Sequence, residues 1–244
     1  MIDLTTRQIQ ILRSIIEDFI KTAQPVGSET IDRKFQIGVS PATIRNEMVE
    51  LEKKKYLVKT HFSSGRVPSS KGYRFYIKNI MKEKELSTVD EVAYKHSIWD
   101  ERDKEYKMFT QATRILAQKT GLLSLITTNS GDLYYSGISN LINRDEFVTF
   151  DSRRIFTRLD EANFWEEILK LAYVTDQDVM FILGQDDFKD PLFESCSSVF
   201  GEFESPQVKG IVGVIGPKTI HYEDVVPQIR FFSQLIEDIM RETK

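Results

Sequence analysis

Apolar side chains recur at helical spacing through most of the first 84 residues. A separation of three or four residues between apolar positions indicates amphipathic helices, and it predicts them over 5–22, 29–36, 41–53 and 70–84. Thr5, with Gln8 three residues later, predicts a capping box at the start of the first helix. We expect Ser28 to cap the second helix and Gly38 to end it.

Between the last two helices the period shortens to two over Tyr56–Phe62, which predicts a strand. Residues 63–66 have the composition of a turn, Val67 resumes the alternation, and Pro68 stops it. A helix, a short helix, a turn, a third helix and a hairpin follow one another in a winged helix-turn-helix unit. We therefore predict such a unit over residues 1–82.

The remainder of the chain alternates apolar strands with amphipathic helices. Strands are predicted over 122–128, 133–141, 179–183, 196–203 and 210–215. Helices are predicted over 105–119, 162–173 and 225–242. We expect an α+β fold, with an antiparallel or mixed sheet covered by helices on one face. Residues 83–104 are charged and poor in apolar side chains, and we interpret them as a linker or a solvated helix before a second domain at 105–244.

The predicted helix at 41–53 has the make-up of a helix that enters the DNA major groove. Ser40 is a preferred cap, Pro41 suits the first helical position, and a thin apolar stripe leaves most of the surface polar. Asn can pair with adenine, and Arg with guanine. The residues predicted to contact bases or phosphates are Ser40, Thr43, Arg45, Asn46 and Lys53. An ordinary amphipathic surface helix is the alternative.

The hairpin and the helix after it carry further candidates for DNA contact. A basic hairpin tip can enter the minor groove or lie on the backbone, where cations meet phosphates. The residues predicted to make these contacts are Lys59, Ser64, Gly65, Arg66 and Lys71.

Charge is divided unevenly along the chain. Residues 1–84 contain 16 Lys and Arg against 9 Asp and Glu, whereas residues 85–244 contain 17 against 28. A basic N-terminal part on an acidic body indicates that any nucleic-acid contact is confined to the first third. The alternative is a small basic domain that binds no nucleic acid.

Enzymatic chemistry finds no support in the sequence. His61, His96 and His221 lack metal-ligand spacing, and there is no phosphate-binding loop. Cys196 has no nucleophile signature, so we expect a buried core thiol. No apolar run approaches the ~20 residues of a membrane span. We predict a cytoplasmic, nucleoid-associated protein that is not an enzyme and holds no metal or cofactor.

Four blocks of the N-terminal part, in order and spacing, closely resemble the bacterial heat-inducible transcription repressor family HrcA. These blocks are Leu4-Thr5-x-Arg7-Gln8, Pro25–Ser28, Ser40–Met48 and Ser63–Arg74. A weaker resemblance continues through Gly137–Leu141, Ser195–Ser197 and Gly213–Pro217. The resemblance implies a winged helix followed by a GAF-like domain. It also implies a homodimer that binds an inverted-repeat operator upstream of chaperone genes, a chaperonin that keeps the repressor active, and relief of repression by heat.

The sequence departs from the family in one place that bears on assembly. Members carry a dimerising insertion inside the GAF-like domain, but here the strand at 122–128 passes almost directly into Gly131–Leu133. We therefore expect this insertion to be absent or reduced. Two other functions compete with a repressor: a winged-helix regulator that senses a small effector, and a winged helix that binds protein.

Overall fold

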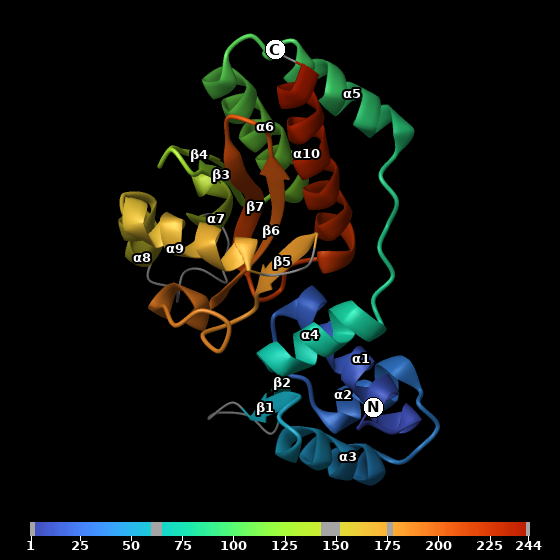
Figure 1. Ribbon diagram of the computed structural model, residues 1–244. Coiled ribbons are helices and arrows are strands. Elements are labelled where there is room, and N and C mark those ends of the chain that lie inside the picture. The colour runs from blue at the N-terminus through green and yellow to red at the C-terminus, as the bar shows by residue number, and fades with distance from the viewer. Residues whose placement is uncertain (1–2, 60–64, 143–151, 175–177, 243–244) are drawn as a thin grey trace. The chain divides into compact units, whose positions relative to one another are not determined.

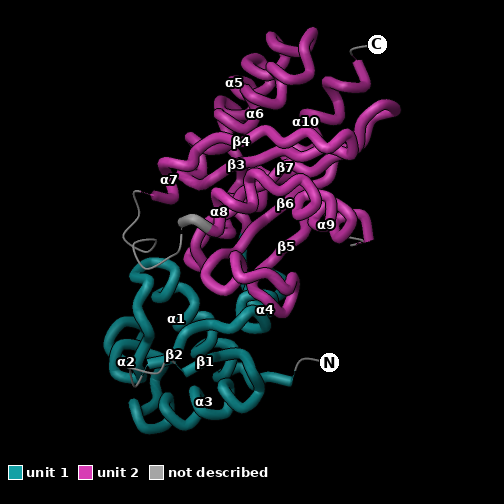
Figure 2. The backbone as a smooth tube through the Cα atoms, turned by 90° about the vertical axis from the view of Figure 1, so that its left-hand side faces the viewer, with its two compact units in different colours: residues 1–82 teal, residues 83–244 magenta. Residues whose placement is uncertain are grey.

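The computed structural model describes residues 3–59, 65–142, 152–174 and 178–242 (Figure 1). The chain forms two compact units, residues 1–82 and 83–244, which are coloured separately in Figure 2. Within the described residues, no helix combines the length and the apolar character that crossing a membrane requires.

Unit 1 contains helices and one hairpin. Its elements are α1 (Thr6–Thr22), α2 (Ser28–Phe35), α3 (Pro41–Lys53), β1 (Leu57–Lys59), β2 (Arg66–Pro68) and α4 (Ser70–Asn79). The predicted order is therefore present, although α4 ends five residues before the predicted limit. The broad apolar face of α1, with Ile11, Leu12, Ile15 and Ile16 at 0% exposure, forms the centre of this unit.

The helix starts in unit 1 agree with the predictions at two places and differ at a third. Thr5 and Gln8 form the capping box, and Ser40 Oγ accepts a hydrogen bond from Thr43 N at 3.2 Å. The cap of α2 is Gly27 rather than Ser28, and no side chain bonds this end. The helix ends at Gln36 in the left-handed region, two residues before Gly38, because the backbone there already reverses at φ 46°.

The hairpin is shorter than the alternating pattern suggested. β1 and β2 are antiparallel, with Leu57 opposite Pro68 and Lys59 opposite Arg66. Arg66 thus begins the second strand instead of lying in the turn. The predicted strand beyond Lys59 and the predicted tip residue Ser64 lie outside the described residues. Val26 and Arg66 exchange two backbone hydrogen bonds of 2.9 Å, so the segment before α2 joins the edge of the hairpin.

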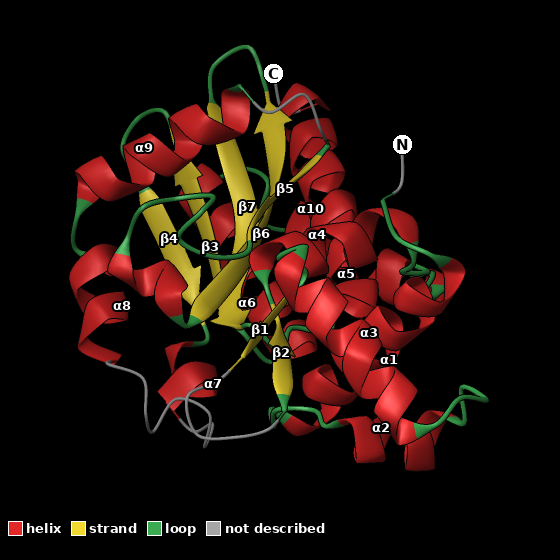
Figure 3. Ribbon diagram, turned by 90° about the horizontal axis from the view of Figure 1, so that it is seen from below, coloured by secondary structure: helices red, strands yellow, loops and turns green. Residues whose placement is uncertain are grey.

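Unit 2 is built on a five-stranded sheet, seen from below in Figure 3. Its strands are β3 (Leu123–Thr128), β4 (Leu133–Ser136), β5 (Val179–Ile182), β6 (Cys196–Glu204) and β7 (Lys209–Pro217). The spatial order is β4-β3-β7-β6-β5, and every neighbouring pair is antiparallel. The helical elements are α5 (Thr88–Trp99), α6 (Glu105–Thr120), α7 (Ile138–Ile142), α8 (Ser152–Leu159), α9 (Ala162–Tyr173), η2 (Pro191–Glu194) and α10 (Tyr222–Glu242). The predicted α+β class is confirmed.

Helices cover both faces of this sheet, so the expectation of a single covered face is wrong. Successive residues of a strand point to opposite faces. Phe200 of β6 belongs to a buried cluster with Phe164 and Ile168 of α9. Its neighbour Gly201 instead faces α10, where an added Cβ would meet Ser233 Oγ at 2.9 Å. Long apolar strands bury side chains on both faces, which the continuous pattern of β6 and β7 reflects.

The predicted strand over 133–141 is also wrong in its second half. β4 stops at Ser136, Gly137 turns the chain with φ 89°, and α7 begins at Ile138. Asn140 holds this short helix in place, since its Nδ2 donates to Ala117 O at 3.1 Å and to Leu122 O at 3.0 Å. Short apolar runs do not distinguish a strand from a helical turn.

The predicted linker segment is bonded to unit 2. α5 buries Tyr94 and Ile98, and Lys84, in the extended segment before it (Figure 1), bonds to α10. Pro227 lies inside α10 and has no N–H to give to the carbonyl of Glu223, four residues earlier. Lys84 N donates to that carbonyl at 2.9 Å instead.

Ion pairs add to the attachment of this segment. Lys84 Nζ lies 2.8 Å from the carboxylate of Asp224, and Arg230 Nη1 lies 2.5 Å from Glu83. We name the contacts of residues 83 and 84 with α10 the α10 clasp.

Candidate nucleic-acid interface

Helix α3 buries a narrow stripe and exposes the rest of its surface. Ile44, Met48 and Leu51 are 0–3% exposed and pack into unit 1. Arg45 and Asn46 are exposed on the other side. Neither has a hydrogen-bond or ion-pair partner within the described part of the chain. Their guanidinium and amide groups are therefore available to a ligand.

The other predicted residues of α3 have local partners. The hydroxyls of Ser40 and Thr43 lie 3.0 Å apart at the helix start, and Lys53 Nζ lies 2.7 Å from Glu50 of the same helix. Glu47, on the adjacent side, accepts from Gln8 Nε2 at 3.0 Å and so connects α3 to α1. These bonds fix the start and orientation of the helix.

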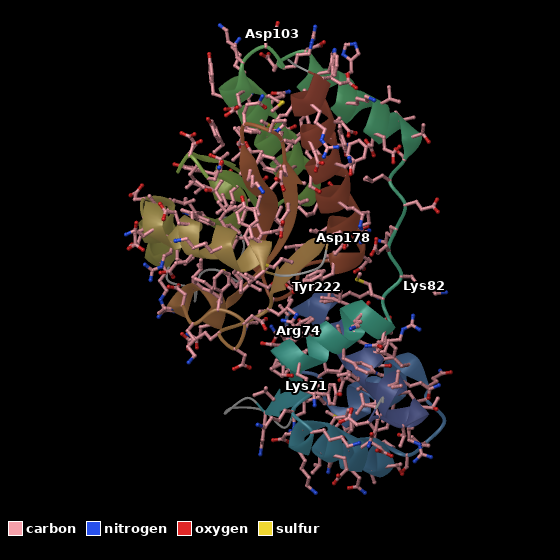
Figure 4. All side chains as sticks on the ribbon, in the orientation of Figure 1. Lys71, Arg74, Lys82, Asp103, Asp178 and Tyr222 are labelled. Atoms are coloured by element: carbon pink, nitrogen blue, oxygen red, sulfur yellow. The ribbon has the colours of Figure 1, made fainter. Side chains whose placement is uncertain are left out.

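The three predicted cations outside α3 differ in how they are engaged. Lys59 is exposed and has no ion-pair partner among the described residues. Arg66 Nε lies 2.7 Å from Glu52, and its side chain is only 12% exposed. Lys71 of α4, labelled in Figure 4, donates to Lys54 O at 3.0 Å and lies 4.1 Å from the centre of the Tyr56 ring. Arg66 thus supports unit 1 itself and is largely buried, whereas Lys71 is exposed, as expected, although it also contacts Lys54 and Tyr56.

A hollow of about 590 Å³ lies between α3, the start of α2 and the hairpin. Residues Gly27–Thr30, Arg45, Met48, Val49 and Lys59 line it, together with Pro25, Gly65 and Arg66. Gly65 permits this arrangement, because a Cβ at that position would lie 2.9 Å from the backbone carbon of Pro25. Arg45 and Lys59, both predicted to contact DNA, thus line one hollow.

Sequence reasoning missed the residues at the start of α2. Gly27, Ser28 and Thr30 border the hollow although they were not among the predicted contacts. The available signal was the Pro25–Gly27 break immediately before a helix, which places main-chain N–H groups at the surface. That signal was interpreted only as a helix boundary.

Unit 2 contains a cluster that could attract a cation. Ligand atoms of His221, Glu223 and Asp224 lie within 4.8 Å of one another. The ion pair with Glu223 raises the pKa of His221, and the same contact lowers the pKa of Glu223. Asp224 already pairs with Lys84, so the cluster is balanced by its own cations.

Cys196 is buried, as predicted. Burial raises the pKa of its thiol to about 12. The reactive thiolate is therefore disfavoured at neutral pH.

The sequence was compared with known protein families and proteins. Residues 42–226 match the family model described as HrcA protein C terminal domain. A heat-inducible transcription repressor HrcA from Clostridium tetani is 43% identical over 146 residues, which cover 59% of this chain and 42% of that protein. Its counterpart from Lysinibacillus sphaericus is 48% identical over 124 residues, covering 50% and 36%. The matched regions thus span less than half the length of these curated relatives.

The fold was compared with solved structures. A crystal structure described as that of a hypothetical protein has a TM-score of 0.78 at 17% identity, and the match covers 99% of this chain and 100% of that one. At this identity the similarity concerns the fold alone. Because the family model covers most of the chain, the protein belongs to the HrcA family.

Proposed function

We propose that the protein is a DNA-binding transcription repressor of heat-shock chaperone genes. It binds an inverted-repeat operator as a homodimer and is released on heat stress. The observation that carries this proposal is the exposed Arg45–Asn46 surface of α3 beside Lys59, which is unpaired among the residues that the structure describes. Relatives bearing the name heat-inducible transcription repressor support the repressor activity and the stimulus, whereas the chaperone genes come from the family resemblance.

In this proposal unit 1 acts as a winged helix-turn-helix domain at 1–82. A GAF-like domain occupies 105–244, and residues 83–104, which connect the two domains, also pack on it through α5 and the α10 clasp. The order α1, α2, α3, β1, β2, α4 supports the first assignment. The antiparallel sheet with helices on both faces supports the second.

The chemistry of recognition follows from the two kinds of polar group on α3. Asn46 reads a base edge in the major groove, where an amide can pair with adenine. Arg45 and Thr43 contact a base edge or a neighbouring phosphate, and Ser40 contacts phosphate near the helix start. Lys59 neutralises a backbone phosphate, whereas Arg66 holds the hairpin in position through Glu52.

Dimerisation and heat sensitivity are assigned to unit 2. Its negative charge keeps it away from the duplex, and loosening of its packing on heating would separate the paired reading helices. A chaperonin would help to keep the repressor active, as the family resemblance implies. A protein with this function works in the cytoplasm, at the nucleoid.

A gel-shift titration with an inverted-repeat operator and a scrambled duplex tests the proposal. We expect Asn46→Ala to weaken operator binding by ~1–3 kcal/mol and to leave scrambled DNA unaffected, because only base contacts carry sequence preference. Asn79→Ala is the matched control, since Asn79 is an exposed amide that bonds its own helix at Phe75 O. Equal losses on both duplexes would remove Asn46 from base recognition, and failure of the unaltered protein to bind either would refute the repressor function.

A regulator that senses a small effector is the competing function. It receives less support, because the matching relatives are named for heat induction and not for a ligand. Adding chaperonin to the same titration favours the repressor if operator binding rises.

A further inference from the structure

The start of α2 has the chemistry of an anion-binding site. We propose that the first-turn N–H groups of α2, the Ser28 hydroxyl, Arg45 and Lys59 together bind one backbone phosphate of the DNA duplex. This inference rests on the proposed function and adds a contact on a helix other than α3.

The contact would lie on a surface with a fixed position within unit 1. The exchange of backbone hydrogen bonds between Val26 and Arg66 fixes the residue before the α2 cap to the hairpin. Gly65 lies directly against Pro25. The start of α2 is therefore held beside Lys59 and opposite Arg45, and these parts line one hollow.

The N–H groups at this helix start have no acceptor in the described part of the chain. Gly27 is the cap and supplies no side chain, and the first helical bond runs from Ile31 N to Gly27 O. The N–H groups of residues 28–30 are thus without an acceptor among the described residues. Free N–H groups and the helix dipole together favour an anion at such an end.

Ser28 provides an independent sign of a ligand. The residue is only 6% exposed, yet its hydroxyl has no hydrogen-bond partner in the part of the chain that the structure describes. Ser28 is one of the residues that line the hollow. A buried hydroxyl normally finds a partner, and a phosphate oxygen in the hollow would be one.

The charges around the hollow favour an anion, with one exception. Arg45 and Lys59 contribute two cations without ion-pair partners among the described residues. Glu29 also lines the hollow and is exposed. Its carboxylate would repel a phosphate, which makes it a useful position for a test.

The position of Arg45 favours DNA as the source of the phosphate. Arg45 follows the start of α3 and precedes Asn46, the residue proposed to read a base. A phosphate at the hollow would thus lie on the backbone that borders the groove occupied by α3. Inorganic phosphate has the same chemistry, so the experiment must separate the two sources.

The test compares Gly27→Asn with Gly27→Ala. Gly27 has φ −97° and ψ 162°, which any residue adopts, and an added Cβ meets nothing within 4 Å. Asn at a cap accepts from the N–H groups of the first turn, whereas Ala cannot. The Asn variant therefore satisfies the groups that the phosphate needs, while the Ala variant leaves them free.

We expect the Asn variant to be the more stable of the two and the Ala variant to bind DNA more tightly. Gly27→Asn should melt no lower than the unaltered protein but bind an operator duplex about three- to tenfold more weakly. Gly27→Ala should melt lower but bind within about twofold. The salt dependence of binding should be unchanged in both, because no cation is lost. Glu29→Gln should bind about two- to fivefold more tightly at low salt.

Equal affinities of the Asn and Ala variants would overturn the inference while leaving the proposed function standing. If the unaltered protein binds no duplex, the proposed function fails and the inference fails with it. Amide spectra of labelled protein separate the sources of phosphate. Shifts at residues 28–30 on adding duplex support the inference, whereas saturation by inorganic phosphate below millimolar concentration, without competition by duplex, would overturn the assignment to DNA.

Discussion

Lys59 and Arg66 face each other across the hairpin, but only Arg66 is bound to a carboxylate. From the sequence alone the two residues carry the same charge. Their surroundings differ, because Lys59 is available to a phosphate and Arg66 supports the fold. An ion pair with a largely buried member resists removal of one partner, because the other charge is left without compensation.

This difference predicts distinct consequences of two alanine substitutions. Lys59→Ala should weaken binding to all duplexes alike, flatten the salt dependence by about one phosphate, and leave the melting temperature unchanged. Arg66→Ala should lower the stability of unit 1 by about 1–3 kcal/mol. Calorimetry and a salt titration of each variant measure both effects. An Arg66→Ala protein with unaltered melting and a flattened salt dependence would show that Arg66 meets phosphate directly.

The His221–Glu223 pair predicts a pH dependence of stability in unit 2. The pKa of His221 is raised above its usual 6.5, so its contribution is full below that value and is lost as pH rises through the raised pKa. The pKa of Glu223 is lowered below its usual 4.5, so its contribution is present above that value and is lost as pH falls through the lowered pKa. The pair therefore stabilises most between these values.

We expect His221→Gln to lower the melting temperature by about 2 °C near pH 5.5, because a partly exposed pair contributes less than ~1 kcal/mol. The difference from the unaltered protein should shrink as the pH rises from there through the raised pKa of His221. Thermal melts across this range make the measurement. A constant difference at all pH values would mean that His221 acts through packing and not through its charge.

At the scale of elements, α3 was predicted with the bounds that the structure has, because a serine-proline start and an apolar stripe act locally. The faces of the central sheet were not predictable in the same way. Phe200 lies against Gly213 of the neighbouring strand, and Phe203 lies against Gly210. These glycines leave space for the two rings, which a Cβ at either position would occupy. Such cross-strand contacts have no signature in a single segment.

The candidate site divides along the same line. Arg45, Asn46 and Lys59 were identified from local patterns. Two features were not visible in this way: Arg66 forms an ion pair with Glu52, and Ser28 lines the same hollow. Both depend on the contact between the hairpin and the segment before α2. A helix without a side-chain cap is visible in the sequence only as a glycine beside a break.

The seating of the hairpin on the segment before α2 predicts a specific effect of Gly65→Ala. An added methyl group would lie within 3.0 Å of Pro25 backbone atoms, so either segment must shift. We expect unit 1 to lose ~1–3 kcal/mol and DNA binding to weaken through displacement of Lys59. Gly131→Ala, where nothing lies within 4 Å but φ 85° strains any side chain, is a control that should lower stability without weakening DNA binding. Unchanged melting of the Gly65 variant would contradict this packing.

At the scale of the whole molecule, the two units carry opposite charges. Residues 1–82 hold 15 Lys and Arg against 8 Asp and Glu, and residues 83–244 hold 18 against 29. An acidic body discourages non-specific wrapping of DNA, so that attraction is concentrated on unit 1. The proposed dimer would then present two separate basic surfaces to one face of a duplex.

A dimer of this kind predicts a periodic dependence on the distance between half-sites. Reading helices about 34 Å apart, or a multiple of it, match half-sites on the same side of the duplex. Inserting about half a helical turn should abolish cooperative binding, and inserting a full turn should restore more of it than the half turn does. Anisotropy titrations with a spacer series measure this, and a monotonic fall in affinity would indicate independent monomers.

The α10 clasp limits the number of residues between the two units that have no main-chain attachment. Met81 N is held by Tyr76 O on one side, and Lys84 N by the carbonyl that Pro227 leaves open on the other. The main chain is thus anchored on both sides of Lys82 and Glu83, and the join spans only a few ångströms per residue. An alanine in place of Pro227 would supply an N–H to the Glu223 carbonyl and weaken the bond from Lys84 N, leaving the ion pairs of Glu83 and Lys84 to hold the segment. A single imino acid, far along the chain from unit 1, thus provides the acceptor that fixes the first residues of unit 2.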